Sequence, residues 1–271
     1  MHNLLNSTMR GVAALSVGAV MLASTAAMAA EKVSAEIGTS YNTHFISYGA
    51  DVWGGGTDFY GDRSTTFVWG SVNVQATDML SFNAGAWADV NNNTTSAIGG
   101  QLQEVDVWFG GKLAIGKATI GATYQLWNYA GDVEEIVDLS LGFDDSGLLP
   151  IALNPGITWH IRTQGNGTQE EGSAVVVSIG PSFKLTESLS LTIPAGVGFF
   201  LDDDFQGGTE DGYAYSYIGG SLGVPLSFIP PAYGSWALNF DLIAYFTDSD
   251  AIPGNPEENF VTGSVGLKLT F

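Results

Sequence analysis

The sequence lacks cysteine and is poor in positive charge. Its 271 residues include 28 Asp and Glu but only 8 Lys and Arg, which gives a formal net charge of −20. Because phosphate binding needs clustered Lys and Arg, this balance argues against nucleic acid as a partner. Without cysteine, disulfide bonds cannot stabilise the fold, so its stability must come from other interactions.

Charge of either sign is scarce as well. Charged residues make up 13% of the chain, against roughly 25% in an average soluble domain. A surface that faces lipid would account for this scarcity. No apolar run after residue 30 reaches membrane-helix length, which is about 20 residues. Such a surface would therefore be built from strands, and closing the sheet would remove its unpaired edges.

The first 30 residues have the pattern of a secretory signal. Arg10 supplies a positive charge, residues 11–23 form an apolar run, and Ala27-Met28-Ala29-Ala30 contains two overlapping small-x-small sites. This combination predicts export and cleavage. We expect cleavage after Ala30, with Ala29 as the alternative, which leaves residues 31–271 as one mature domain. A retained amphipathic helix is the other interpretation.

The rest of the chain consists of segments in which apolar and polar residues alternate. Because successive side chains of a strand point to opposite faces, each segment would have one apolar and one polar face. The segments are about as long as a tilted strand that crosses a bilayer. We predict twelve strands, at 33–48, 65–76, 80–90, 103–115, 118–129, 135–143, 156–163, 173–184, 189–201, 213–228, 235–247 and 260–271.

The connections between these segments alternate in length. Short ones occur at 77–79, 116–117, 185–188 and 229–234, and most of the others are long and polar. Bacterial membrane barrels have an even strand number, short periplasmic turns and longer outer loops. The pattern therefore predicts an all-β fold, a single closed antiparallel transmembrane β-barrel of about twelve strands. A soluble β-sandwich is the alternative, but it does not require short and long connections to alternate.

The last strand carries a more specific pattern. Val265, Leu267, Leu269 and Phe271 share one face, and the chain ends on the aromatic. This resembles the closing strand of Gram-negative outer-membrane β-barrels, where a terminal Phe and apolar residues at every second position form the assembly signal. The resemblance implies the cell outer membrane as the location. It also implies outer-membrane lipid and the envelope barrel-assembly machinery as partners.

A second resemblance lies at the start of the mature chain. Residues 40–49, followed by a loop and a Trp-containing strand, are similar to uncharacterised proteobacterial outer-membrane proteins. Tyr48-Gly49 lacks the Arg that those proteins often have there. The similarity carries no functional residues.

The polar rows opposite the apolar ones would face the lumen. Their aromatic residues favour either a stacking surface for sugars and other flat solutes or an ordinary interface belt. Their acids and bases predict a lumen of nearly balanced charge. The candidate channel-lining residues are Trp69, Trp87, Asp89, Asp106, Trp108, Lys112, Trp127, Tyr129, Asp138, His160, Arg162, Tyr213, Tyr215 and Asp241.

The long loops carry most of the acids and would form an acidic rim that attracts cations. Asp202, Asp203 and Asp204 are a candidate Ca²⁺ site because Ca²⁺ prefers several oxygen ligands. They lack the spacing of a calcium loop, so a solvated loop is the alternative. We expect no other cofactor or metal.

No catalytic motif is present. No sequence motif links a particular serine to His160 as a catalytic partner. We expect His160 and Arg162 instead to form a row of charged side chains facing Asp138 on the adjacent strand. We therefore predict no enzyme but a narrow, cation-favouring passive channel for small solutes. The alternatives are a closed structural or surface-binding barrel acting through its acidic loops, and a lipid-acting membrane enzyme.

Overall fold

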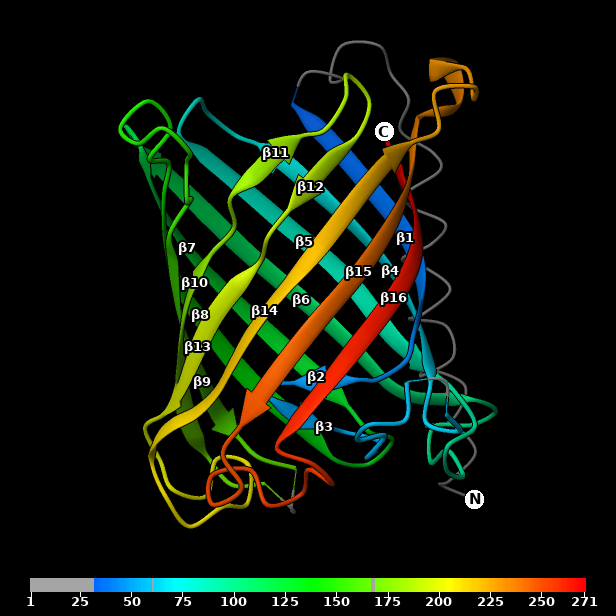
Figure 1. The fold of residues 1–271 in the computed structure, drawn as a ribbon, viewed down its shortest axis with the longest axis vertical. Helices are drawn as coiled ribbons and strands as arrows, with labels where there is room; N and C mark the ends of the chain where they lie inside the picture. The colour runs from blue at the N-terminus through cyan, green and yellow to red at the C-terminus, as the bar shows by residue number, and fades with distance from the viewer. Residues whose placement is uncertain (1–31, 60, 167–168) are drawn as a thin grey trace, which may run out of the picture.

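Alternating polarity produces a closed antiparallel barrel of twelve strands in the computed structural model, which describes residues 32–59, 61–166 and 169–271 (Figure 1). The predicted signal peptide lies outside these residues. Ten strands are continuous: β1 (Val33–Asn42), β4 (Thr65–Gln75), β5 (Leu80–Val90), β6 (Leu102–Ile115), β7 (Ala118–Asn128), β8 (Val133–Phe143), β9 (Gly156–Gln164), β14 (Gly212–Pro225), β15 (Ser235–Thr247) and β16 (Asn259–Thr270).

The other two barrel strands are interrupted by proline. β10 (Gly172–Ile179) continues as β11 (Ser182–Lys184) after Pro181, and β12 (Ser190–Thr192) continues as β13 (Ala195–Phe200) after Pro194. Proline has no N–H to donate to the ladder, so pairing breaks at both sites. A short 3₁₀ helix, η1 (Pro231–Tyr233), lies in the turn before β15. No helix in the described parts of the chain is long and apolar enough to cross a membrane.

The first and last strands close the barrel. β1 pairs with β16 from Glu36↔Thr270 to Asn42↔Ser264, and β1 also pairs with β4. Every strand of the ring therefore has two neighbours, except that β11, the continuation of β10, pairs with β12 alone. The twelve-stranded barrel is confirmed, and the sandwich alternative is wrong.

The outer face of the barrel is apolar, as the alternation predicts. Large side chains in mid-strand positions remain exposed, among them Phe109 at 60%, Leu242 at 55% and Ile218 at 51%. A continuous band of this kind is unfavourable in water and is the surface expected of a barrel embedded in lipid.

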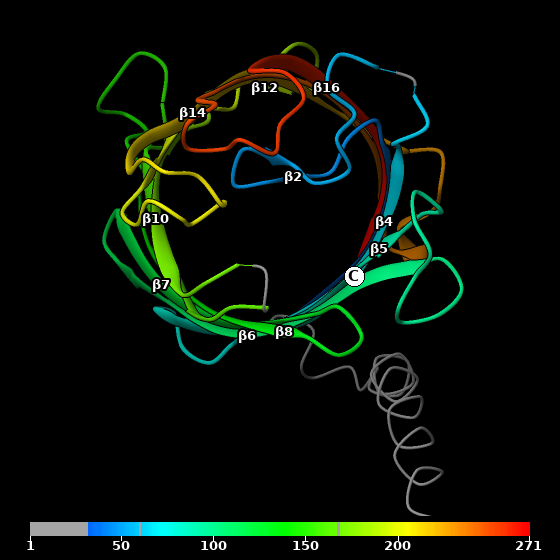
Figure 2. The same ribbon diagram turned by 90° about the horizontal axis from the view of Figure 1, so that it is seen from below.

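The first predicted strand is too long. β1 ends at Asn42 instead of residue 48, and the chain then enters the barrel, where β2 (Ile46–Ser47) pairs with β3 (Ala50–Asp51). Tyr48 (φ 46°) and Gly49 (φ 83°) connect the two short strands. Two consecutive residues with positive φ form the tight hairpin turn that matches strand twist. Seen along the barrel axis, β2 lies inside the ring of strands (Figure 2).

Phe271 belongs to the expected assembly signal and has an exposed side chain. Its backbone N–H donates to Ala35 O (2.9 Å), but its side chain is 61% exposed. Phe271→Ala should therefore leave the free energy of unfolding almost unchanged and lower the amount of barrel assembled in cells several-fold. Heat-modifiability of membrane fractions measures the assembled protein. Equal amounts of folded wild type and variant would contradict the assembly role.

Candidate functional site

Residues 45–52, called the inner hairpin below, cross the barrel lumen. At one wall the ring of Phe45 lies 5.2 Å from that of Phe67 on β4 and 5.3 Å from that of Trp87 on β5, measured between centroids. At the hairpin tip the ring of Tyr48 lies 3.9 Å from that of His160 on β9. The inner hairpin thus reaches from one side of the barrel to the opposite side.

Hydrogen bonds from two other loops hold the inner hairpin. The side chain of Asn255 donates to Gly49 O (2.9 Å) and accepts from the backbone N–H of Asp51 (2.7 Å). Gln206 Nε2 donates to Ser47 O (3.1 Å). Three connections that are far apart in the sequence therefore meet inside the barrel, at the end with the long loops.

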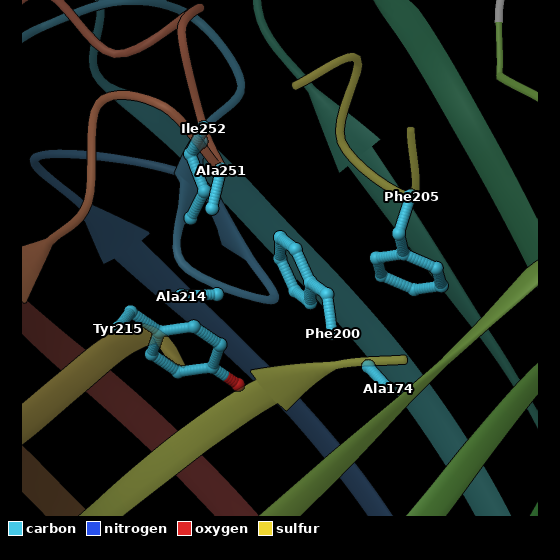
Figure 3. Packing of buried hydrophobic residues seen from close by; sticks show 7 residues of the cluster. All are labelled: Ala174, Phe200, Phe205, Ala214, Tyr215, Ala251 and Ile252. Carbon is cyan, nitrogen blue, oxygen red and sulfur yellow. The ribbon is translucent and has the colours of Figure 1, made fainter. Parts of the chain in front are cut away.

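Apolar packing joins the same three connections. The buried cluster contains Ala174, Phe200, Phe205, Ala214, Tyr215, Ala251 and Ile252 (Figure 3). Gly49 at the hairpin tip fits closely against it, since an added Cβ would lie 2.6 Å from Tyr215 and 2.8 Å from Ile252. Phe205, Ala251 and Ile252 come from the long connections predicted to form an acidic rim. Parts of these connections instead fold inward, because they carry apolar residues that become buried.

A buried ion pair lies under this cluster. Arg162 Nε donates to Glu134 Oε2 (2.9 Å), and the two side chains are 2% and 0% exposed. Arg162 Nη1 also donates to the backbone oxygen of Phe205 (2.9 Å), and the guanidinium carbon lies 4.4 Å from the centre of the Phe205 ring. One arginine therefore links β8, β9 and an inward-folded loop.

A second polar group surrounds His160. Its Nδ1 lies 2.7 Å from Asp138 Oδ1, and the hydroxyl of Tyr48 is within hydrogen-bond distance of the same nitrogen. Gln125 Nε2 donates to Asp138 Oδ2 (2.6 Å). The contact of His160 with Asp138 is confirmed, but Arg162 binds Glu134 instead of joining that row.

Asp51 is a buried acid within the inner hairpin. Its Oδ2 accepts from the N–H of Gly56 (2.7 Å), whereas Oδ1 is buried without a hydrogen-bond partner among the described residues. Burial raises the pKa of this carboxyl. A raised pKa means that the protonated form is favoured in the docked hairpin, so docking is more stable below that pKa and weakens as the pH rises through it.

Acidic side chains line the wall beside the inner hairpin. Asp89 on β5 pairs in register with Glu104 on β6, and Asp106 follows Glu104 on the same face. The side chains of Glu104 and Asp106 hydrogen-bond each other, which requires a proton on one of them, and both acids interact electrostatically with Asp89 and Glu134. Trp53 Nε1 donates to Asp89 Oδ2 (2.9 Å). The three acids Asp89, Glu104 and Asp106 are called the acidic wall below.

The prediction of a balanced lumen is therefore wrong. Glu134 fell just outside the predicted strand 135–143, and Glu104 has the parity of Asp106, so the sequence pattern could have identified it. Glu36 also faces inward, where it accepts from Trp69 Nε1 (2.9 Å) and pairs with Lys268 at 3.3 Å. With these residues included, the inner face carries more acids than bases.

Most of the predicted lining residues have the inward parity, but Tyr213 does not. A β-bulge between Gly198 and Phe199 places Tyr213 opposite Phe199 on the outer face. Tyr213 is 43% exposed, and its hydroxyl donates to Phe246 O (3.1 Å). An extra residue reverses the parity of a strand beyond it, and the sequence gave no sign of the bulge.

Two other predicted residues make contacts on the inner face. Tyr215 lies in the buried cluster, and Asp241 accepts from Ser264 Oγ (2.6 Å). Many of the remaining predicted lining residues surround a cavity of about 420 Å³, called the tryptophan cavity below. It is lined by Trp69, Asn83, Trp87, Asp106, Trp108, Lys112, Thr123, Gln125 and Trp127.

The acids considered for Ca²⁺ do not form a metal site. Asp202 Oδ2 accepts from the backbone N–H (2.7 Å) and the hydroxyl (3.2 Å) of Ser173. Within residues 32–59, 61–166 and 169–271, no group of three or more acidic or histidine side chains could hold a metal ion. The structure gives Asp202 a role in fixing its loop to β10.

Comparison with known proteins identifies the fold. No family model and no curated protein matches the sequence. Among solved structures, the chain is similar to the NanC porin, with 8% identity, a TM-score of 0.51 and coverage of 88% of this chain and 98% of that one. It is also similar to an outer-membrane channel from Pseudomonas putida F1, with 12% identity, a TM-score of 0.52 and coverage of 89% and 96%. The chain has the fold of Gram-negative outer-membrane β-barrels.

Proposed function

We propose that this protein is a narrow, passive, cation-favouring channel for small solutes in the outer membrane. The observation that carries the proposal is the acidic wall beside a hairpin that crosses the lumen. Solutes would pass the inner hairpin at the narrowest section, where the carboxylates set the sign of the potential. The similar structures support it in general terms, since they are described as a porin and an outer-membrane channel.

The position of the acids favours cations. Rings and rows of carboxylates inside a pore attract cations and repel anions, and walls of low dielectric strengthen their field. Of the four interacting acids near the inner hairpin, Glu134 is paired with Arg162. The acidic wall contributes the remaining charge. Selectivity would therefore come from inside the barrel, where salt screens charges less than it does at an exposed rim.

Glu104→Gln combined with Asp106→Asn should lower the K⁺/Cl⁻ permeability ratio by about half or more, because it removes the negative charge of this pair of acids from the narrow section. Reversal potentials across a KCl gradient measure the ratio. As a control, neutralising the exposed acids Asp203, Glu210 and Asp211 to Asn or Gln tests an origin at the rim. We expect a smaller change there, because exposed charges are screened over about 10 Å in 0.1 M salt. A larger effect of the control would refute the acidic wall as the origin.

A closed barrel is the second candidate. The apolar cluster formed by the inward-folded loops favours it, because packed apolar side chains exclude water and ions. Such a barrel would act through its acidic loops as a structural or surface-binding protein. Absence of any conductance for purified protein in a planar bilayer would select this candidate.

Location and assembly follow from the same proposal. The chain would be exported with cleavage of its signal peptide, bind the envelope barrel-assembly machinery through the strand that ends at Phe271, and lie in outer-membrane lipid. It would have no enzymatic activity, in keeping with the similar structures, which are described as a porin and an outer-membrane channel.

A further inference from the structure

The tryptophan cavity presents flat aromatic surfaces to the lumen. Trp69 lies opposite Gly38, and Trp108 lies opposite Gly85. An added Cβ at Gly38 would be 2.1 Å from Trp69 Cζ2, and one at Gly85 would be 2.2 Å from Trp108 Cζ2. Each indole therefore covers a glycine on the neighbouring strand and lies along the wall. Glycine is required at both positions for this placement of the rings.

The two charged groups of the tryptophan cavity lie far apart. Asp106 and Lys112 are on the same face of β6, six positions apart in the sequence. At about 3.3 Å per residue, their backbones are separated by roughly 20 Å. The end with Asp106 adjoins Glu104, so the carboxylates and the ammonium group define a negative and a positive end.

Asp106 also has an unsatisfied polar atom. Its Oδ1 is buried and has no hydrogen-bond partner in the described structure. A buried polar atom without a partner is costly, and a charged one more so. The side chain of Asp106 also shares a hydrogen bond with Glu104, so the two acids together carry a negative charge at this end of the cavity. A cation bound beside them would be attracted by that charge. A neutral solute stacked on the indoles would leave the charge unneutralised, and an anion would be repelled by the acidic wall.

We propose that the tryptophan cavity binds organic monocations that combine a ring or methylated ammonium group with an apolar body. Their positive group would contact the faces of Trp108 and Trp87 and the carboxylate of Asp106. Cation–π attraction acts within about 6 Å of a ring and is strongest for Trp. Rings that already lie flat lose little freedom on binding, which favours affinity. The inference rests on the proposed function only for passage of the ligand, not for its binding.

Isothermal titration of the folded full-length protein in detergent with benzyltrimethylammonium tests the proposal. We expect saturable binding that Asp106→Asn and Trp108→Leu each weaken about tenfold, since each removes one contact to the cation. Trp159→Leu is the matched control, because Trp159 is 43% exposed on the outer face. It should bind like the wild type. Benzyl alcohol and glucose are the neutral comparison ligands and should bind at least about tenfold more weakly.

The outcomes separate this inference from the channel. No saturable binding to protein that conducts KCl would overturn the cation site and leave the channel in place. Stronger binding of glucose than of benzyltrimethylammonium would also overturn it. Saturable binding to protein that conducts no KCl would support the site and refute the channel. If Trp108→Leu lowers heat-modifiable folding, Gly85→Ala is the second variant, and unchanged binding there would refute the need for a flat indole.

Discussion

Replacing residues 45–52 by two glycines should raise single-channel conductance at least about twofold, because the inner hairpin crosses the lumen and narrows it. The barrel itself should persist, since β1, β4 and β16 pair without the hairpin. Conductance of purified protein in a planar bilayer at molar KCl measures the effect. The high salt isolates the change in cross-section from the change in charge, because the Debye length there is about 3 Å.

Shortening the loop between β5 and β6 is the matched control. Its tip at Gly99 and Gly100 has open space around it, and the loop lies outside the ring of strands in Figure 2. Replacing residues 95–100 by two glycines should leave conductance unchanged. Equal conductance of the hairpin variant and the wild type would refute the constriction. A variant that conducts beside a silent wild type would show that the inner hairpin closes the barrel.

Arg162→Met should destabilise the barrel by about 3–5 kcal/mol, because it leaves the buried carboxylate of Glu134 without its ion pair. It also removes the donor to Phe205 O and the contact with the Phe205 ring. Urea unfolding in lipid vesicles, followed by tryptophan fluorescence, gives the free energy. Adding Glu134→Leu to Arg162→Met should recover part of the loss, since it removes the uncompensated charge.

The second ion pair of the inner face supplies the control. Lys268 and Glu36 are 37% and 32% exposed and lie 3.3 Å apart. Lys268→Met should therefore cost at most about 1 kcal/mol, as is usual for solvent-accessible pairs. A cost for Lys268→Met equal to that for Arg162→Met would show that burial does not determine the importance of these pairs.

The sequence by itself determined the barrel wall. Strand polarity has a period of two, so the alternation in β5 and β6 fixed which side chains face outward and which face the lumen. The long and short connections fixed the antiparallel order, and the strand ending at Phe271 indicated the class of barrel. Trp69, Trp108 and Asp106 could be placed inside for this local reason alone.

The tertiary structure alone decided what fills the lumen. The inner hairpin is held by Tyr48 against His160, 112 positions away, and by Asn255 against Gly49, 206 positions away. Arg162 donates to Glu134 and to the backbone oxygen of Phe205, which an inward-folded loop brings beside it. Polarity along a strand is a local property and can be read from neighbouring residues. The docking of a loop depends on apolar and polar partners that only closure of the barrel brings together.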